Sequence, residues 1–108
     1  MAILISFDID GTLEVGDPPG VLTLDMMRSA QDKGCWIGSC SDRTLSGQRD
    51  LWEHHDIRVD FVAAKPMLRE IMSRFKADGY YHIGDREDLD KRYALDAGFE
   101  FLWPHEAI

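Results

Sequence analysis

The stretch Ile3-Leu4-Ile5-Ser6-Phe7-Asp8-Ile9-Asp10-Gly11-Thr12 decides how the rest of the chain is interpreted. Its first five residues are mostly apolar and predict a buried β-strand. Two carboxylates one residue apart, Asp8 and Asp10, follow this run directly, and Gly11 then allows a sharp turn or a close approach of the backbone to a ligand. Because open α/β sheets bind ligands at the carboxyl ends of their strands, the stretch predicts a site at a sheet edge.

Outward from this stretch, apolar runs alternate with amphipathic segments along the whole chain. Strands are expected over residues 3–7, 35–40, 59–64, 80–83 and 99–103. Helices are expected over residues 22–33, 45–55 and 88–97, with a further helix from a first turn at Pro66 to an end at Gly79. This β-α-β order predicts an α/β fold with a five-stranded, mostly parallel sheet, right-handed crossovers and helices on both faces.

Size and charge narrow the class of protein. A chain of 108 residues fits a single domain, residues 1–108. The formal charge of −8 opposes a broad electrostatic attraction to duplex DNA or to an anionic membrane. No apolar stretch approaches the roughly 20 residues of a membrane span, and residues 1–7 are too short for a signal peptide. We therefore expect a cytoplasmic protein that binds no membrane.

The two cysteines, Cys35 and Cys40, are expected on opposite faces of one strand. A disulfide between them is then disfavoured. Both are expected to be reduced and mostly buried thiols.

Polar side chains follow four of the expected strands, and the strand ends share one edge of the sheet. They are Asp8 and Asp10, Ser41, Lys65, and Asp85 with Asp90 nearby. Like charges about 4 Å apart repel by roughly 4 kcal/mol at an effective dielectric constant near 20, so a cluster of carboxylates needs a cation. Mg²⁺ prefers oxygen ligands beside a phosphate, and Lys65 adds a further positive charge. The edge therefore suits an incoming phosphate group.

These residue types support phosphoryl transfer. Asp8 can act as a nucleophile that forms an aspartyl-phosphate. Asp10, two residues on and on the same face of an extended backbone, can protonate the leaving alcohol and later activate water. Ser41 can hydrogen-bond a phosphoryl oxygen, Lys65 can hold both the phosphate and Asp8, and Asp85 can bind the metal.

The motifs resemble those of the haloacid dehalogenase (HAD) superfamily of phosphohydrolases, in order and over nearly the whole chain. The matching residues are Asp8-Ile9-Asp10-Gly11-Thr12, Ser41-Asp42-Arg43, Lys65-Pro66, Gly84-Asp85 with Asp90, and Gly98. The resemblance implies a Rossmann-like three-layer α/β/α sandwich. It also implies Mg²⁺ bound by Asp8, the Asp10 backbone carbonyl and Asp85, with Asp90 as a second acid of the cluster, in direct contact with the metal or not. The acid at Asp10 favours phosphatase over dehalogenase chemistry.

The candidate catalytic residues are thus Asp8, Asp10 and Lys65. Candidate substrate-binding residues are Gly11, Thr12, Ser41, Asp42, Arg43 and Arg86. Arg43 and Arg86 fit either phosphate contacts or surface salt bridges, and Ser39 is an alternative to Ser41 in the second motif. His82 is interpreted as a strand histidine whose ring nitrogens are hydrogen-bonded.

The spacing of the motifs predicts an enzyme without a cap domain. The segments from Thr12 to Ser41 and from Ser41 to Lys65 have room only for a helix, a strand and short connections. An open site then needs cover from a large substrate or from a second subunit, which makes a homo-oligomer one expectation. Residues 14–20, rich in glycine and proline, are the only local segment suited to a small flap.

Two alternatives to a phosphatase fit the same residues. Receiver domains use clustered acids, a Ser/Thr, a Lys and Mg²⁺, but their phospho-accepting Asp follows the third strand, where this chain has Lys65. A phosphate-binding protein could also keep the fold without the chemistry. The substrate is left open among sugar phosphates, nucleotides, phosphoproteins and nucleic-acid ends, the last weakly disfavoured by the negative charge.

Overall fold

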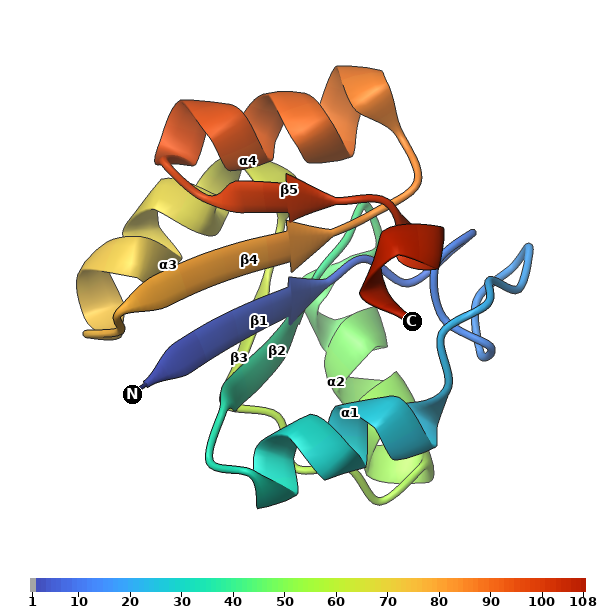
Figure 1. Cartoon of the computed structure of the whole chain (residues 1–108). Helices are drawn as coiled ribbons and strands as arrows, with labels where there is room; N and C mark the ends of the chain where they lie inside the picture. The colour runs from blue at the N-terminus through green and yellow to red at the C-terminus, as the bar shows by residue number, and fades with distance from the viewer. Residues whose placement is uncertain (1) are drawn as a thin grey trace.

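The computed structural model describes residues 2–108 and contains one five-stranded sheet in which every neighbouring pair of strands is parallel. The strands are β1 (Ile3–Phe7), β2 (Trp36–Cys40), β3 (Phe61–Ala63), β4 (Gly79–Ile83) and β5 (Glu100–Leu102). Their order across the sheet is β3-β2-β1-β4-β5, so β1 lies in the centre. Figure 1 shows that β1, β4 and β5 end at the same edge.

Helices cover both faces of this sheet. The helices α1 (Leu24–Asp32) and α2 (Leu45–His54) lie on one side, and α3 (Leu68–Arg74) and α4 (Arg92–Ala97) lie on the other (Figure 1). The predicted Rossmann-like three-layer sandwich is therefore confirmed, with a sheet that is parallel throughout. Within residues 2–108, the segments between the motif residues form only these helices and strands with their connections, and no cap domain.

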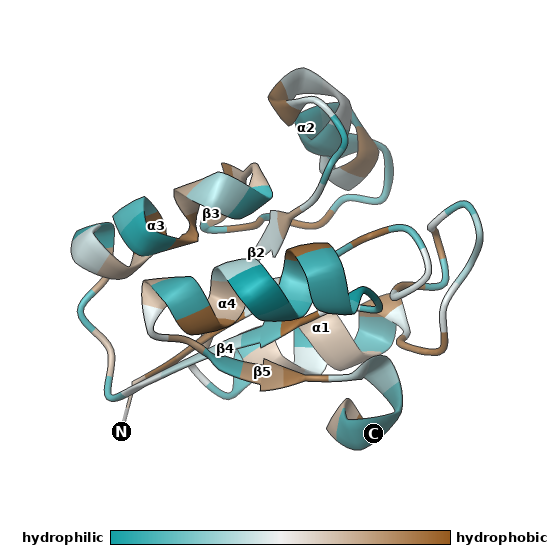
Figure 2. Ribbon diagram, turned by 90° about the horizontal axis from the view of Figure 1, so that it is seen from above, coloured by the Kyte–Doolittle hydropathy of each residue, from teal (hydrophilic) through white to brown (hydrophobic). Residues whose placement is uncertain are grey.

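Alternation along β1 divides the hydrophobic core into two. Leu4 packs with residues of α3 and α4, whereas Phe7 packs with residues of α1 and α2. Burying such a side chain contributes about 1.5–3 kcal/mol. The outward surface of α4 is mainly hydrophilic, as Figure 2 shows from that side. β1 is thus fixed from both faces, which holds the carboxylates at its end in place.

The third predicted helix was too long at its C-terminal end. α3 ends at Arg74 because Phe75 adopts an extended backbone (φ −123°, ψ 118°). The Phe75 ring packs against Trp36, and the Tyr80 hydroxyl donates to the Phe75 carbonyl. Gly79 is therefore the first residue of β4, and not the end of a helix.

Other boundaries differ by only a few residues. α1 begins at Leu24 because the Thr23 hydroxyl accepts a hydrogen bond from the amide of Met26. Gly98 ends α4 in a left-handed conformation (φ +91°), as predicted for a helix C-terminus. Cys40 is buried as expected, but Cys35 is partly exposed, and the two thiols are free. None of the helices formed by residues 2–108 is long and apolar enough to cross a membrane.

Candidate active site

The candidate site lies where the direction of strand addition reverses. β1 pairs with both β2 and β4, and the chain crosses from β3 at one side of the sheet to β4 at the other. Open α/β sheets bind ligands at this switch point, beyond the carboxyl ends of the strands. Asp8 directly follows β1, and one residue separates β4 from Asp85. The two acids therefore lie at the same edge, at the ends of neighbouring strands.

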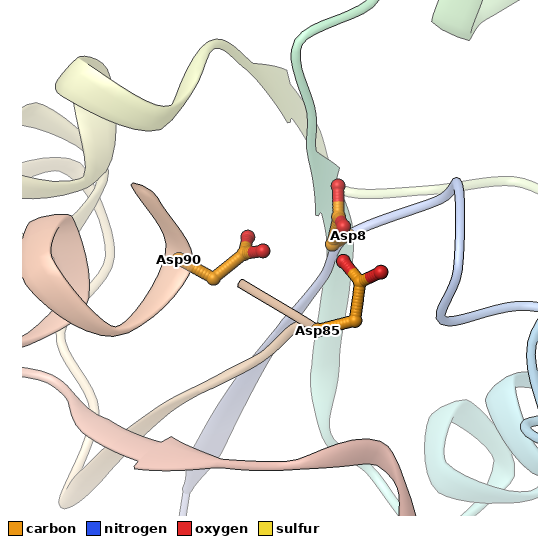
Figure 3. A group of neighbouring side chains, drawn as sticks. All are labelled: Asp8, Asp85 and Asp90. Carbon is orange, nitrogen blue, oxygen red and sulfur yellow. The ribbon is translucent and has the colours of Figure 1, made fainter. Parts of the chain in front are cut away.

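Three carboxylates converge at this edge. Asp8, Asp85 and Asp90 each offer one oxygen, and these oxygens all lie within 4.8 Å of one another. Figure 3 shows the three side chains pointing toward a common space from three separate segments of the chain. Asp8 is 3% exposed and Asp90 0%, whereas Asp85 is exposed. The cluster predicted from sequence is therefore present, with one acid open to solvent.

Two glycines allow the acids to approach the backbone this closely. A Cβ on Gly11, whose φ is +77°, would lie 1.9 Å from a carboxylate oxygen of Asp85. A Cβ on Gly84 would lie 2.2 Å from the carboxyl carbon of Asp90. Both distances are far below van der Waals contact, so the two glycines are needed to accommodate the carboxylates.

A turn of π-helix, Glu87–Lys91, brings Asp90 into the cluster. The amide of Lys91 donates to the carbonyl of Arg86 at 3.0 Å, which widens this turn by one residue relative to an α-helix. The amide of Arg86 in turn donates to Asp90 Oδ2 at 3.1 Å. The sequence predicted an ordinary helix over residues 88–97, and apolar periodicity gives no signal for the wider turn.

Lys65 is the buried cation of the site. Its ammonium group lies 3.7 Å from Asp8 Oδ1, 3.2 Å from Asp90 Oδ1 and 3.3 Å from Asp42 Oδ2. Burial alone lowers the pKa of Lys65, but the charges of these three carboxylates outweigh it and the net pKa is raised. Lys65 is therefore a fixed positive charge beside Asp8, as the sequence predicted.

One lysine does not neutralise the cluster. Burial, followed by the charge of Asp90, raises the pKa of Asp8 from 3.8 to about 8. Burial also acts to raise the pKa of Asp90, but the hydrogen bond from His82 and the charge of Lys65 outweigh it and the pKa is lowered. The Thr12 hydroxyl donates to Asp8 Oδ2 at 3.4 Å. Asp8 is thus held protonated near neutral pH unless a further cation is present.

The residues fit a hard divalent cation. Three carboxylates supply the oxygen ligands that Mg²⁺ and similar ions take, and burial together with the charge of Asp90 raises the pKa of Asp8, which a bound cation would offset. Asp8, Asp85 and Asp90 would hold the ion. The Asp10 carboxylate pairs with Arg43, and binding of the metal by the Asp10 backbone carbonyl, which the resemblance implies, stays a prediction.

The raised pKa of Asp8 predicts a pH-dependent stability of the metal-free protein. A carboxyl group whose pKa rises on folding stabilises the fold fully below its unfolded pKa of 3.8, and this contribution is lost as the pH rises toward 8. Asp8→Asn should therefore increase the free energy of unfolding relative to wild type more at pH 8 than at pH 5. Urea denaturation with a chelator at both pH values measures this. An equal difference at the two pH values would contradict the raised pKa of Asp8.

Asp10 forms a bidentate ion pair with Arg43. Arg43 Nη2 lies 2.6 Å from Asp10 Oδ1 and Arg43 Nε lies 3.1 Å from Oδ2, while the amide of Asp17 donates to Oδ1 at 2.7 Å. The hydrogen bonds from Arg43 lower the pKa of Asp10. Asp10 is therefore ionised in this arrangement, and Arg43 forms the ion pair that was one of its two expected roles.

Ser41, and not Ser39, faces the site. Ser41 lines the cavity next to Asp8, and its hydroxyl accepts from the amide of Arg43 at 3.1 Å. Ser39 is buried behind it, where it accepts from Trp52 Nε1 at 2.9 Å and donates to Gln48 at 2.6 Å. Of the two serines that fit the second motif, Ser41 is therefore the one next to Asp8.

The cavity at this edge measures about 190 Å³. Its lining residues are Asp8, Asp10, Pro18, Ser41, Asp42, Lys65, Asp85 and Arg86. Pro18 comes from the loop at residues 14–20, and the amide of Gly11 donates to its carbonyl at 2.6 Å. Small-molecule pockets usually measure about 300–1,000 Å³, so this cavity is small and has room for a phosphoryl group.

Some predicted substrate contacts are not part of this lining. Thr12 is buried behind Asp8 and supports its carboxylate, and Gly11 lies against Asp85. Arg86 does line the cavity but pairs with Asp88 at 2.7 Å on the surface. Of the predicted substrate-binding residues, Ser41, Asp42 and Arg86 line the cavity, and Arg43 lies next to it, paired with Asp10.

Sequence reasoning missed a buried hydrogen-bond chain beneath the acids. His82 lies in β4 with Nδ1 2.9 Å from Ser6 Oγ and Nε2 2.8 Å from Asp90 Oδ1. The histidine is hydrogen-bonded at both ring nitrogens, as expected, but its link to the carboxylate cluster was not foreseen. The available signal was that Ser6 and His82 are polar residues within strand patterns that are otherwise mostly apolar.

Comparison with known proteins finds no matching family model, no matching curated protein and no matching solved structure. The haloacid dehalogenase resemblance therefore rests on the motifs alone.

Proposed function

We propose that this protein is a Mg²⁺-dependent phosphomonoester hydrolase of the haloacid dehalogenase type, acting through an aspartyl-phosphate on Asp8. The observation that supports this most is the convergence on Asp8 of Lys65, at 3.7 Å, and of the Asp85 and Asp90 carboxylates. Ser41 and Asp10 line the same cavity. These are the groups that a covalent route to phosphate hydrolysis needs.

In the first half of the reaction, a carboxylate oxygen of Asp8 attacks phosphorus. The bond from phosphorus to the substrate oxygen breaks, and the leaving oxygen takes a proton from the Asp10 carboxyl. Lys65 stabilises charge on the phosphoryl oxygens, and the Ser41 hydroxyl donates to one of them. The products are the alcohol and a phosphoryl group bound to Asp8.

In the second half, water attacks the same phosphorus atom. Asp10, now a carboxylate, takes the proton of this water, and the bond from phosphorus to the Asp8 oxygen breaks. Inorganic phosphate leaves, Asp8 is again a carboxylate and Asp10 is again protonated. Atoms and charges balance over the two halves, and no other reactant is required.

The bound cation would supply charge stabilisation for the phosphoryl oxygens and would keep Asp8 ionised. Asp8, Asp85 and Asp90 would hold it. Gly11 and Gly84, which leave room for the carboxylates, favour a site built for this purpose over an accidental cluster.

The strand order disfavours a receiver domain. Receiver-like doubly wound sheets have the order 2-1-3-4-5, whereas this sheet has the order 3-2-1-4-5. The candidate nucleophile also follows β1 and not β3. A catalytically idle phosphate binder is disfavoured because Asp8 and Asp10 both line the cavity. Measured turnover decides between a phosphatase and an idle phosphate binder.

The size of the cavity indicates how the substrate binds. About 190 Å³ holds the phosphoryl group and leaves the leaving group outside. We infer a phosphomonoester carried on a larger molecule, or a site completed by a second copy of the chain, because a small leaving group would have few contacts here. The loop at residues 14–20 contributes only Pro18 as local cover.

Hydrolysis of an aryl phosphate tests this function. We expect phosphate release by the purified protein in the presence of Mg²⁺, and at least a tenfold lower rate after a chelator removes divalent metal, because the carboxylate cluster then repels the phosphate. Restoring Mg²⁺ should restore the rate. A rate that is unaffected by the chelator would exclude the metal-assisted mechanism. Separately, a screen of phosphomonoesters with the active protein identifies the preferred leaving group.

A further inference from the structure

We propose that His82 is a positioning residue for the proposed reaction. It lies in β4 and fixes the carboxylate of Asp90 by a hydrogen bond. Asp90 then presents a free lone pair to the divalent cation. This role rests on the proposed function, because it assigns His82 to the metal cluster of that site. The fold alone does not require a histidine at this position.

The geometry forms one continuous chain of contacts. Ser6 in β1 and His82 in β4 are direct neighbours in the parallel ladder. Ser6 Oγ lies 2.9 Å from His82 Nδ1, and His82 Nε2 lies 2.8 Å from Asp90 Oδ1. Ser6, His82 and Asp90 are each 0% exposed, so no solvent replaces a lost partner.

Because a carboxylate only accepts, Nε2–H of His82 donates to Asp90 Oδ1. In the neutral imidazole, Nδ1 then accepts from the Ser6 hydroxyl. Oδ1 also receives the Lys65 ammonium at 3.2 Å, whereas Oδ2 receives only the amide of Arg86 at 3.1 Å. Oδ2 is therefore the oxygen with more capacity for a metal ion or a water bound to it.

A purely structural role explains this arrangement poorly. A buried polar chain costs free energy unless each member is satisfied, and apolar residues would fill a sheet face more simply. In β1 the other residue facing α3 and α4 is Leu4, which packs in the apolar core. The chain ends on Asp90, next to Lys65 and Asp8. Outer partners of this kind typically change metal affinity by about 10–100-fold when removed.

The experiment compares three variants by Mn²⁺ binding without substrate, followed by electron paramagnetic resonance of free Mn²⁺. His82→Leu should weaken binding by about 10–100-fold. His82→Gln keeps an N–H donor on a side chain of comparable reach, and its affinity should return to within a few-fold of wild type. Trp52→Phe is the matched control, because it removes a different buried donor, the one to Ser39, and should leave Mn²⁺ affinity unchanged.

A second readout uses the imidazole nitrogens. In ¹⁵N-histidine spectra, Mg²⁺ should shift the His82 ring signals and leave those of His54, His55 and His105 in place. Urea denaturation reports the stability of each variant separately. A variant that is destabilised but keeps wild-type Mn²⁺ affinity shows a structural effect only, which would overturn the positioning role.

The outcomes separate this inference from the proposed function. Wild-type Mn²⁺ affinity in His82→Leu, together with metal-dependent hydrolysis by the wild type, would overturn the role of His82 and leave the function intact. Weakened Mn²⁺ binding in His82→Leu, together with no hydrolysis of any phosphomonoester by the wild type, would support His82 and overturn the function.

Discussion

Replacing Asp8 by asparagine should abolish turnover, with an expected loss in kcat of at least about 10⁴-fold, in the range found when a catalytic nucleophile is removed. The amide that replaces the carboxylate cannot attack phosphorus, and Lys65 would lose a charged partner 3.7 Å away. The variant should nevertheless fold, because an uncharged side chain relieves the unfavourable burial that raises the pKa of Asp8. Initial rates on an aryl phosphate measure the effect.

The matched control for this prediction is Asp50→Asn, an acid-to-amide change at an exposed position of α2 that is not part of the cavity lining. Its rate should equal that of wild type. Intact-mass measurement after rapid acid quenching should detect a phosphorylated wild-type protein and no such species for Asp8→Asn. Substantial turnover by Asp8→Asn would show that water attacks the substrate directly and that no covalent step occurs.

The sheet could be predicted from local patterns because each strand is a short apolar run, and most of these runs precede a polar residue. The alternation of the runs with helical segments requires parallel strands, and parallel strands bring Asp8, Ser41, Lys65 and Asp85 to one edge. The end of α3 was not predictable in this way. It depends on the Phe75 ring packing against Trp36, a contact between segments far apart in the sequence.

The identities of the acids and the contact of Lys65 with Asp8 were predicted, but the other partners of the acids were not. Asp90 lies within the carboxylate cluster on a π-helical turn, and such a turn has no periodic signature. His82 and Ser6 meet because β1 and β4 are neighbours in a definite register. Sequence order gives the residue types of a site, whereas pairwise contacts depend on strand neighbours and on loops.

The contact between Arg43 and Asp10 is the most consequential of these unforeseen partners. Its bidentate geometry favours the carboxylate form of Asp10 and lowers its pKa. That form suits the second half of the proposed reaction, in which Asp10 accepts a proton from water. In the first half Asp10 must carry a proton, so it must separate from Arg43. A phosphoryl group, which binds guanidinium in the same two-pronged way, is suited to displace Asp10.

Asp10→Asn should therefore lower the rate by about 10²–10⁴-fold, the usual contribution of general acid–base catalysis, while phosphate still binds. The loss should be largest for alkyl phosphates, whose leaving oxygen needs a proton, and smaller for nitrophenyl phosphates, whose leaving group departs without one. The matched control is Asp25→Asn, which breaks another Asp–Arg pair, Asp25 with Arg28 at 3.0 Å on exposed α1, and should leave the rates unchanged. Rates on both substrate types, with binding of inorganic phosphate measured separately, give the comparison. Equal losses on alkyl and nitrophenyl phosphates would contradict the assigned role of Asp10 as the acid that protonates the leaving group.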